Sequence, residues 1–167
     1  YFPNDERILV SRDCGGVENA VLCVCDRNGN ETRLIHGERV QAYFHGWSAD
    51  LESFYVSTNE RDGRFFDLYK IHAASYQRRL LFESPDKYHF SGISPDEHFA
   101  LFVRAPSISS ANIFLCDLSN GQMRSLTNDQ GDVLNCLPVF DREATAVYYI
   151  SDKGSDYRYV MRHDLLT

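Results

Sequence analysis

Short apolar runs alternate with small and polar turn residues along the whole of this 167-residue chain. The runs are about four to eight residues long, rich in Val, Ile, Phe and Tyr, and bounded by Gly, Asn, Asp, Ser or Pro. Such runs are typical of β-strands, whereas amphipathic helices would show apolar residues at a 3.6-residue spacing. The pattern therefore predicts an all-β chain.

One turn-and-strand motif recurs at nearly constant spacing. The clearest copies are WSAD at 47–50 and ISPD at 93–96, each followed by an apolar run, and weaker copies begin at Phe2 and Phe140. Aligning the four copies gives steps of 47−2 = 45, 93−47 = 46 and 140−93 = 47 residues. A second landmark, the polar residue that closes a later apolar run, recurs at Asp26, His72 and Asp117, with steps of 46 and 45 residues.

Two landmarks with one period indicate a repeat fold. Periods of about 40 to 50 residues that contain several short strands are typical of β-propeller blades. We therefore predict a partial β-propeller of about four blades, mostly of four antiparallel strands each, with a repeat of 45 to 47 residues. The blades are placed at residues 1–37, 38–84, 85–127 and 128–167 of a single propeller domain.

Fourteen strands are expected, in the same order within each blade. The first blade lacks its first strand and the last blade lacks its fourth, so we expect apolar blade faces to be exposed and the chain to self-associate. Two copies forming an eight-blade ring is the simplest arrangement, and closure of one copy into a four-blade ring is the alternative. The strands are expected near 7–12, 20–26, 32–35, 40–47, 53–57, 66–71, 77–82, 88–93, 99–104, 112–116, 122–126, 134–140, 145–151 and 157–163.

The turn residues add detail to this pattern. Asn28-Gly29 is a strong hairpin signal in which both residues are expected to have positive φ, and Asn120-Gly121 lies in the corresponding turn of the third blade. The acids of the repeated motif, Asp50 and Asp96, are expected to accept hydrogen bonds from backbone N–H groups of their own turns.

Several stretches together resemble a known family. Phe2–Leu9, Gly46–Ser48, Ser53–Tyr69 and Gly92–Ser94 are similar to the N-terminal β-propeller of bacterial prolyl oligopeptidase family serine peptidases, whose WD-like blade motif is shared with TolB-like propellers. The run Ser57–Tyr69 is its most specific part. In that family the propeller covers a C-terminal α/β-hydrolase domain with a Ser, Asp and His triad, restricts access to the buried active site and selects substrate size.

The resemblance implies a non-catalytic domain with two partners. These are the α/β-hydrolase domain of the parent chain, absent from this sequence, and the peptide or acyl-aminoacyl substrate that this domain cleaves. The alternative is a TolB-like protein-interaction propeller without peptidase activity. The sequence of the parent reading frame after residue 167 would distinguish the two.

No catalytic residue is predicted in this chain. A nucleophile elbow requires Gly-x-Ser-x-Gly, and the near matches at 46–50 and 92–96 end in Asp. Because a catalytic elbow occurs once and a blade turn recurs, Ser48 and Ser94 are interpreted as structural. His45-Gly46, which has the appearance of an oxyanion loop, lies in the same repeated turn and is interpreted in the same way.

The five cysteines contain no Cys-x-x-Cys pair. Cys23 and Cys25 share slots of the repeat with large apolar residues and with Cys116, so these three are expected to be reduced and buried in the core. Cys14 and Cys136 complete the set. No metal site and no cofactor is predicted, since the histidines also lack ligand spacing. Unpaired cysteines favour a cytoplasmic location.

The charge balance excludes some classes of partner. With 17 basic against 24 acidic residues the net charge is −7, and the basic residues are scattered, so no nucleic-acid surface is expected. No apolar run is long enough to span a membrane. The chain starts at Tyr1 without Met, so we expect the N-terminus of the parent to lie upstream and its targeting to be unreadable.

The loops between second and third strands are the candidate partner sites, because they share a face with the blade-to-blade connections and loops on rigid scaffolds carry function. Glu60, Arg61, Asp62 and Arg64 make one loop the most charged, and are predicted to contact a peptide terminus or a partner domain. The alternative is an ordinary solvated loop. The four loops are 13–19, 59–64, 105–111 and 152–156.

Overall fold

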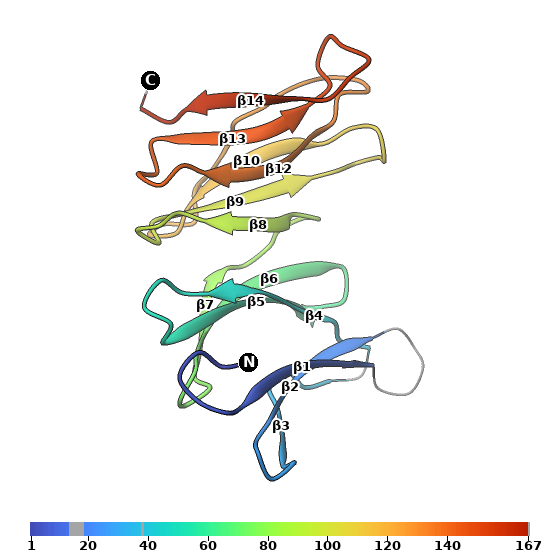
Figure 1. The fold of residues 1–167 in the computed structure, drawn as a ribbon. Coiled ribbons are helices and arrows are strands. Elements are labelled where there is room, and N and C mark those ends of the chain that lie inside the picture. The colour runs from blue at the N-terminus through green and yellow to red at the C-terminus, as the bar shows by residue number, and fades with distance from the viewer. Residues whose placement is uncertain (14–18, 38, 167) are drawn as a thin grey trace. The chain divides into compact units, whose positions relative to one another are not determined.

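A computed structural model describes residues 1–13, 19–37 and 39–166. Within those residues the chain contains fourteen β-strands and no helix, and the strands form four antiparallel sheets (Figure 1). The chain divides into two compact units, Tyr1–Asp86 and Lys87–Thr167, and each unit contains two of the sheets. The all-β prediction is confirmed.

The first unit holds sheets 1 and 2. Sheet 1 has the order β1-β2-β3 and sheet 2 the order β4-β5-β6-β7, so strands adjacent in sequence are adjacent in space. Every pairing is antiparallel, which is typical of meanders joined by short hairpins. The strands are β1 (Ile8–Asp13), β2 (Ala20–Cys25), β3 (Glu31–Arg33), β4 (Ala42–Trp47), β5 (Ser53–Asp62), β6 (Phe65–His72) and β7 (Arg78–Phe82).

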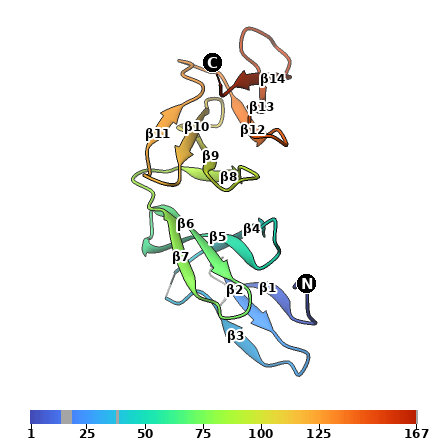
Figure 2. The same cartoon turned by 90° about the vertical axis from the view of Figure 1, so that its left-hand side faces the viewer.

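The second unit repeats this arrangement with sheets 3 and 4. Sheet 3 has the order β11-β10-β9-β8 and sheet 4 the order β12-β13-β14 (Figure 2). The three-stranded first and last sheets agree with the expected strand count. The strands are β8 (His89–Ile93), β9 (Phe99–Arg104), β10 (Asn112–Asp117), β11 (Met123–Ser125), β12 (Asn135–Phe140), β13 (Ala146–Ser151) and β14 (Tyr159–Asp164).

One backbone hydrogen bond marks the start of every repeat. The N–H of the first turn residue donates to the carbonyl five residues later, at 2.8 to 3.0 Å. The first turn residues are separated by 48−2 = 46, 94−48 = 46 and 141−94 = 47 residues, so the expected first step of 45 is one residue too short. The donor and acceptor pairs are Phe2 and Arg7, Ser48 and Ser53, Ser94 and Phe99, and Asp141 and Ala146.

Each unit has an apolar core between its two sheets. In the first unit Leu22 and Val24 of β2 pack with Phe54 and Val56 of β5, and all four are at most 2% exposed. Phe2 joins this core through edge-on contacts with Trp47 and Phe54 at centroid separations of 5.0 and 6.0 Å. Such contacts add to the free energy gained by burial alone.

The core of the second unit occupies the equivalent place. Ile113 and Leu115 of β10 and Leu101 of β9 pack with Val147 and Tyr149 of β13. All five are at most 8% exposed. In both units a sheet therefore presents one apolar face to the sheet that follows it in the chain.

The first strand of sheets 2, 3 and 4 carries a β-bulge that the sequence pattern did not predict. Register shifts occur between Phe44 and Gly46, between Phe90 and Gly92, and between Cys136 and Val139. Bulges bend a strand and re-aim its side chains. In the first of them His45 Nε2 lies 2.7 Å from Ser57 Oγ on β5, so His45 links two strands.

Two detailed expectations were wrong. Asn28 does not have positive φ; only Gly29 does, at 81°, because the turn is closed by a hydrogen bond from Gly29 N–H to Asp26 O and by Asp26 Oδ1 accepting from Asn28 N–H. Cys25 is half-buried rather than in the core, since it lies at the end of β2 opposite Ile8. Its Sγ lies 3.7 Å from a carboxylate oxygen of Glu31.

The remaining cysteines divide into two groups. Cys23 and Cys116 are buried as expected, at 6% and 0% exposure, and Cys136 is half-buried. Cys14 lies outside the described residues. Within the described residues, no disulfide involves Cys23, Cys25, Cys116 or Cys136. Among the residues that the structure describes, no helix has the length and apolar character needed to cross a membrane.

Candidate functional site

The repeated Ser and Asp of the turns between first and second strands are structural. Ser48 Oγ accepts a hydrogen bond from Ser53 N–H at 2.9 Å, and Asp50 Oδ1 accepts from Glu52 N–H at 2.9 Å. Ser94 and Asp96 make the same bonds in the third sheet. Ser48 and Ser94 are 2% and 0% exposed, so neither hydroxyl is open to a substrate. The expected Asx-turn role of both acids is confirmed.

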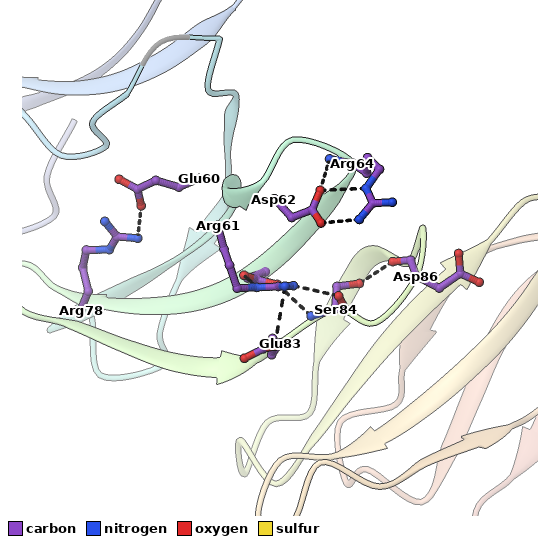
Figure 3. Close-up of polar contacts among 9 residues, drawn as sticks. Glu60, Arg61, Asp62, Arg64, Arg78, Glu83, Ser84 and Asp86 are labelled. Atoms are coloured by element: carbon purple, nitrogen blue, oxygen red, sulfur yellow. Dashed lines mark hydrogen bonds and ion pairs between the residues drawn. The ribbon is translucent and has the colours of Figure 1, made fainter.

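The charged stretch 59–64 is largely strand and bulge, where a loop was predicted. Thr58 pairs with Asp67 and Asp62 pairs with Phe65, so three residues on β5 lie opposite the single residue Phe66 on β6. Only Gly63 and Arg64 form the turn. This bulge directs Glu60, Arg61 and Asp62 to different surroundings (Figure 3).

Asn59, at the start of the bulge, holds the beginning of β4. Its Oδ1 accepts a hydrogen bond from Gln41 N–H at 2.7 Å. In the second unit Asp152 occupies the equivalent position, and its Oδ1 accepts from Leu134 N–H at 2.8 Å. The same polar contact therefore fixes the entry to sheet 2 and to sheet 4.

Glu60 ties sheet 2 to the connection that leaves sheet 1. Its Oε1 accepts from His36 N–H at 3.0 Å, and its Oε2 accepts from Arg78 Nη2 at 2.6 Å. Burial alone would raise the pKa of Glu60, but these two hydrogen bonds lower it below its ordinary value. The Arg78 guanidinium also lies over the Tyr69 ring at 4.4 Å, which fixes the cation in place.

Arg61 makes a bidentate contact with Asp67, a residue whose side chain is 1% exposed. Arg61 Nε and Nη2 lie 2.7 and 2.8 Å from the two carboxylate oxygens, and Nη2 also donates to Ser84 O at 2.9 Å. Asp67 Oδ1 accepts in turn from Ser84 N–H at 2.8 Å. Arg61 thus joins β5, β6 and the segment that leaves β7, as Figure 3 shows.

The third sheet has a neutral counterpart of this clamp. Asn112 occupies the position of Asp67, and its Oδ1 accepts from Asp129 N–H at 3.0 Å. Asp129 also accepts from Lys153 Nζ at 2.6 Å, and Lys153 occupies the position of Glu60 in the repeat. The connection between sheets 3 and 4 is therefore held by an ion pair, whereas the connection between sheets 1 and 2 is held by the bond from His36 N–H to Glu60. Four residues of these contacts were not predicted from the sequence, although the repeat places them at equivalent positions in different sheets: Asp67, Arg78, Asp129 and Lys153.

Asp62 and Arg64 form the outward part of the hairpin. Arg64 Nη2 lies 2.7 Å from Asp62 Oδ2, and the two side chains are 72% and 25% exposed. Hydrogen bonds from the Arg64 side chain and backbone lower the pKa of Asp62 to about 2. Arg64 also lies over the Phe65 ring at 4.9 Å. Of the four predicted site residues, Glu60 and Arg61 bind within the unit, Asp62 is half-buried, and Arg64 is the most exposed.

In the parts of the chain that the structure describes, no three His, Cys, Asp or Glu side chains converge in a way that would hold a metal ion. Of the other three predicted loops, residues 14–18 lie outside the described residues.

Comparison with known proteins rests on structure alone. No protein-family model matches the chain, and no curated protein matches it. TolB from Acinetobacter baumannii is similar over 98% of this chain and 39% of its own, with 17% identity and a TM-score of 0.63. An oligogalacturonate lyase in complex with manganese is similar over 99% of this chain and 47% of its own, with 13% identity and a TM-score of 0.74.

A prolyl endopeptidase is similar over 96% of this chain and 25% of its own, with 13% identity and a TM-score of 0.70. The chain has a β-propeller fold. The partial propeller of about four blades predicted from the repeat is thereby confirmed, and its blades are sheets 1 to 4. At these identities the similarity concerns the fold. The propeller segment spans less than half the length of each of these three proteins.

Proposed function

We propose that this propeller is the non-catalytic domain of a prolyl oligopeptidase-like serine peptidase, which limits access of peptides to a separate α/β-hydrolase domain. The observation that carries the proposal is the β5–β6 hairpin, because it contains the run Ser57–Tyr69 that most resembles this family. Its base is fixed by Glu60 and Arg61, and its tip carries the Asp62–Arg64 pair, in which Arg64 is exposed and Asp62 is half-buried.

A fixed base and a charged tip suit contact with a partner. Since Arg61 and Glu60 immobilise the hairpin through three separate segments, little conformational entropy would be lost when the tip binds. The partner in this proposal is the hydrolase domain or the terminus of a peptide substrate. In an ion pair at the surface, each charged side chain can exchange its partner for a carboxylate or an ammonium group of another molecule at a small cost in free energy.

The test uses the full polypeptide that contains this chain. Hydrolysis of a chromogenic dipeptide and of an unfolded protein of about 100 residues is compared between wild type and the double variant D62A/R64A. We expect the ratio of the two rates to shift at least about threefold in favour of the long substrate in the variant, because the gate is weakened while the catalytic groups are untouched.

The control is R27A, which removes an equally exposed arginine (75% against 72%) from the β2–β3 turn. It should leave the ratio unchanged. Equal ratios for wild type, D62A/R64A and R27A would contradict a gating role of the hairpin. A full polypeptide without hydrolase activity or a hydrolase domain would instead support the alternative, a TolB-like propeller that binds other proteins.

A further inference from the structure

A basic groove lies on the face of sheet 2 that is turned away from the core it shares with sheet 1. Register places Lys70 opposite Arg79 and His72 opposite Ser53, so these four side chains share one face, whereas Ile71 points into the core. The groove has a volume of about 450 Å³. We define the basic groove by six lining residues of the first unit: Ser53, Lys70, His72, Ser75, Gln77 and Arg79.

The lining of the basic groove is cationic, although the chain as a whole has a net charge of −7. Lys70 and Arg79 contribute two positive charges, and among the residues that the structure describes no Asp or Glu lines the groove. The two cations are directly opposite each other on β6 and β7, an arrangement of like charges that destabilises a sheet. An anion bound between them would replace this repulsion with two attractive contacts.

The repeat does not require a cation at the position of Lys70. The row of paired residues across the strands that contains Lys70 begins two residues after the carbonyl that closes the first turn, so its counterparts follow from the register. Lys70 takes the place of Val24 and Leu115, which are 2% and 4% exposed. The rows are Leu9, Val24 and Thr32 in sheet 1, Tyr55, Lys70 and Arg79 in sheet 2, and Leu101, Leu115 and Arg124 in sheet 3.

His72 also departs from the repeat, and the departure removes a negative charge. In sheets 1 and 3 the corresponding residues are Asp26 and Asp117, whose carboxylates accept hydrogen bonds from backbone N–H groups of their turns. His72 has the same role with Nδ1, which accepts from Ser75 N–H at 3.2 Å. The neutral ring then carries its proton on Nε2. Sheet 2 therefore has a hydrogen-bond donor where sheets 1 and 3 have a carboxylate.

The two cations of the groove differ in what holds them. Lys70 Nζ lies over the ring of Tyr55 at 5.9 Å, and Tyr55 is 3% exposed. Lys70 also interacts electrostatically with Asp50, which does not line the groove. Arg79 is exposed, and its guanidinium makes no hydrogen bond or ion pair within the described residues. Lys70 is thus positioned before a ligand arrives, and Arg79 has its donors available.

We propose that the basic groove binds the phosphate group of a small phosphorylated molecule. The planar guanidinium of Arg79 can bind two phosphate oxygens at once, and Lys70 adds a second positive charge. Ser53 and Gln77 are neutral groups that can donate to the remaining oxygen. The volume falls within the range of about 300–1,000 Å³ of small-molecule sites, which leaves room for the organic part of the ligand. This inference does not depend on the proposed peptidase partnership.

The test is isothermal titration calorimetry of the full polypeptide that contains this chain, with phenyl phosphate at about pH 8, where the phosphate is a dianion. We expect a Kd below about 1 mM, weaker binding of inorganic phosphate, and no binding of phenol. R79Q should raise the Kd at least about tenfold, because the charged hydrogen bonds to the phosphate are lost. R79K should lie between R79Q and the wild type, because it keeps the charge without the planar fork.

The matched control is R124Q, which removes an exposed arginine from the equivalent position of sheet 3, where the residue opposite is Leu115. It should leave the Kd unchanged. No binding of phenyl phosphate up to about 10 mM, an R79Q Kd equal to that of the wild type, or an equal loss in R124Q would overturn the proposal.

A second measurement locates the site without any substitution. Phenyl phosphate should slow amide hydrogen exchange in the segment from His72 to Arg79 of the wild-type protein, because a bound ligand stabilises the turn and strands that contact it. Protection confined to other segments would also overturn the proposal.

Discussion

Replacing Asp67 with alanine is expected to destabilise the first unit strongly. The carboxylate is 1% exposed and accepts two hydrogen bonds from Arg61 and one from Ser84 N–H, all between 2.7 and 2.8 Å. D67A leaves the Arg61 guanidinium with only its longer ion pair with Glu83, at 3.7 Å, and leaves the Ser84 N–H without its acceptor. The lost hydrogen bonds are those that join β6 to β5 and to the residues that follow β7.

The size of the effect follows from these contacts. Removing one member of a buried ion pair costs about 3–5 kcal/mol, and orphaning a buried N–H costs about 1–3 kcal/mol. The two overlap, and Arg61 is 38% exposed, so water replaces part of the lost interaction. We therefore expect D67A to lower the free energy of unfolding by about 2–4 kcal/mol.

The assay is urea denaturation monitored by the fluorescence of Trp47. Trp47 is the single tryptophan of the chain and packs in the core of the first unit, so it reports on the unit that is perturbed. With a slope of about 2 kcal/mol per molar urea, the midpoint should fall by about 1–2 M. The matched control is D62A, which removes an aspartate with the same bidentate contact to an arginine, but from the exposed tip.

D62A should leave the midpoint near that of the wild type, because exposed ion pairs contribute little to stability. A D67A midpoint equal to that of D62A would refute the assignment of the Arg61–Asp67 pair as a structural clamp. The burial of Asp67 would then make no difference to the free energy of unfolding.

Three further outcomes are expected. S94A should destabilise the second unit by about 1–2 kcal/mol, measured by thermal unfolding, because Phe99 N–H loses its acceptor. Native thiol labelling followed by mass spectrometry should modify half-buried Cys25 before Cys116, whose pKa burial and Asp117 raise to about 11; equal rates would contradict this order. In carbon-detected NMR titrations Asp62 should protonate near pH 2, so the stabilisation from its pair with Arg64 is complete above about pH 4 and lost as pH falls to 2. R64A should raise that midpoint toward about 3.9, and an unchanged midpoint would count against the pair.

The repeat made most of the fold predictable. The alternation of apolar and polar residues, together with the fixed period, predicted all fourteen strands. The errors are mainly at the strand ends, because the same apolar pattern recurs at the same place in each blade. β5 is the exception, because Glu60, Arg61 and Asp62 are charged and read as a loop, while their backbone continues the strand to Asp62. The pattern of polar residues alone does not reveal a bulge whose charged side chains bind partners within the same unit.

The site was only partly predictable for a related reason. Glu60 and Arg61 were recognised as unusual, but their partners Arg78 and Asp67 lie 18 and 6 residues away on other strands. Pairing across strands depends on register, and the bulge at residues 59–61 alters that register. Asp67 in particular resembles any polar residue of an alternating strand until its burial is known.

Fluorophosphonate labelling most directly tests the proposal that this chain is the accessory propeller of a hydrolase. The probe is applied to the 167-residue chain and to the full polypeptide that contains it, and labelled peptides are mapped by mass spectrometry. The expected result is no label on the isolated chain and one labelled serine of the full polypeptide outside residues 1–167. Label on Ser48 or Ser94, or no labelled serine anywhere in the full polypeptide, would contradict that role.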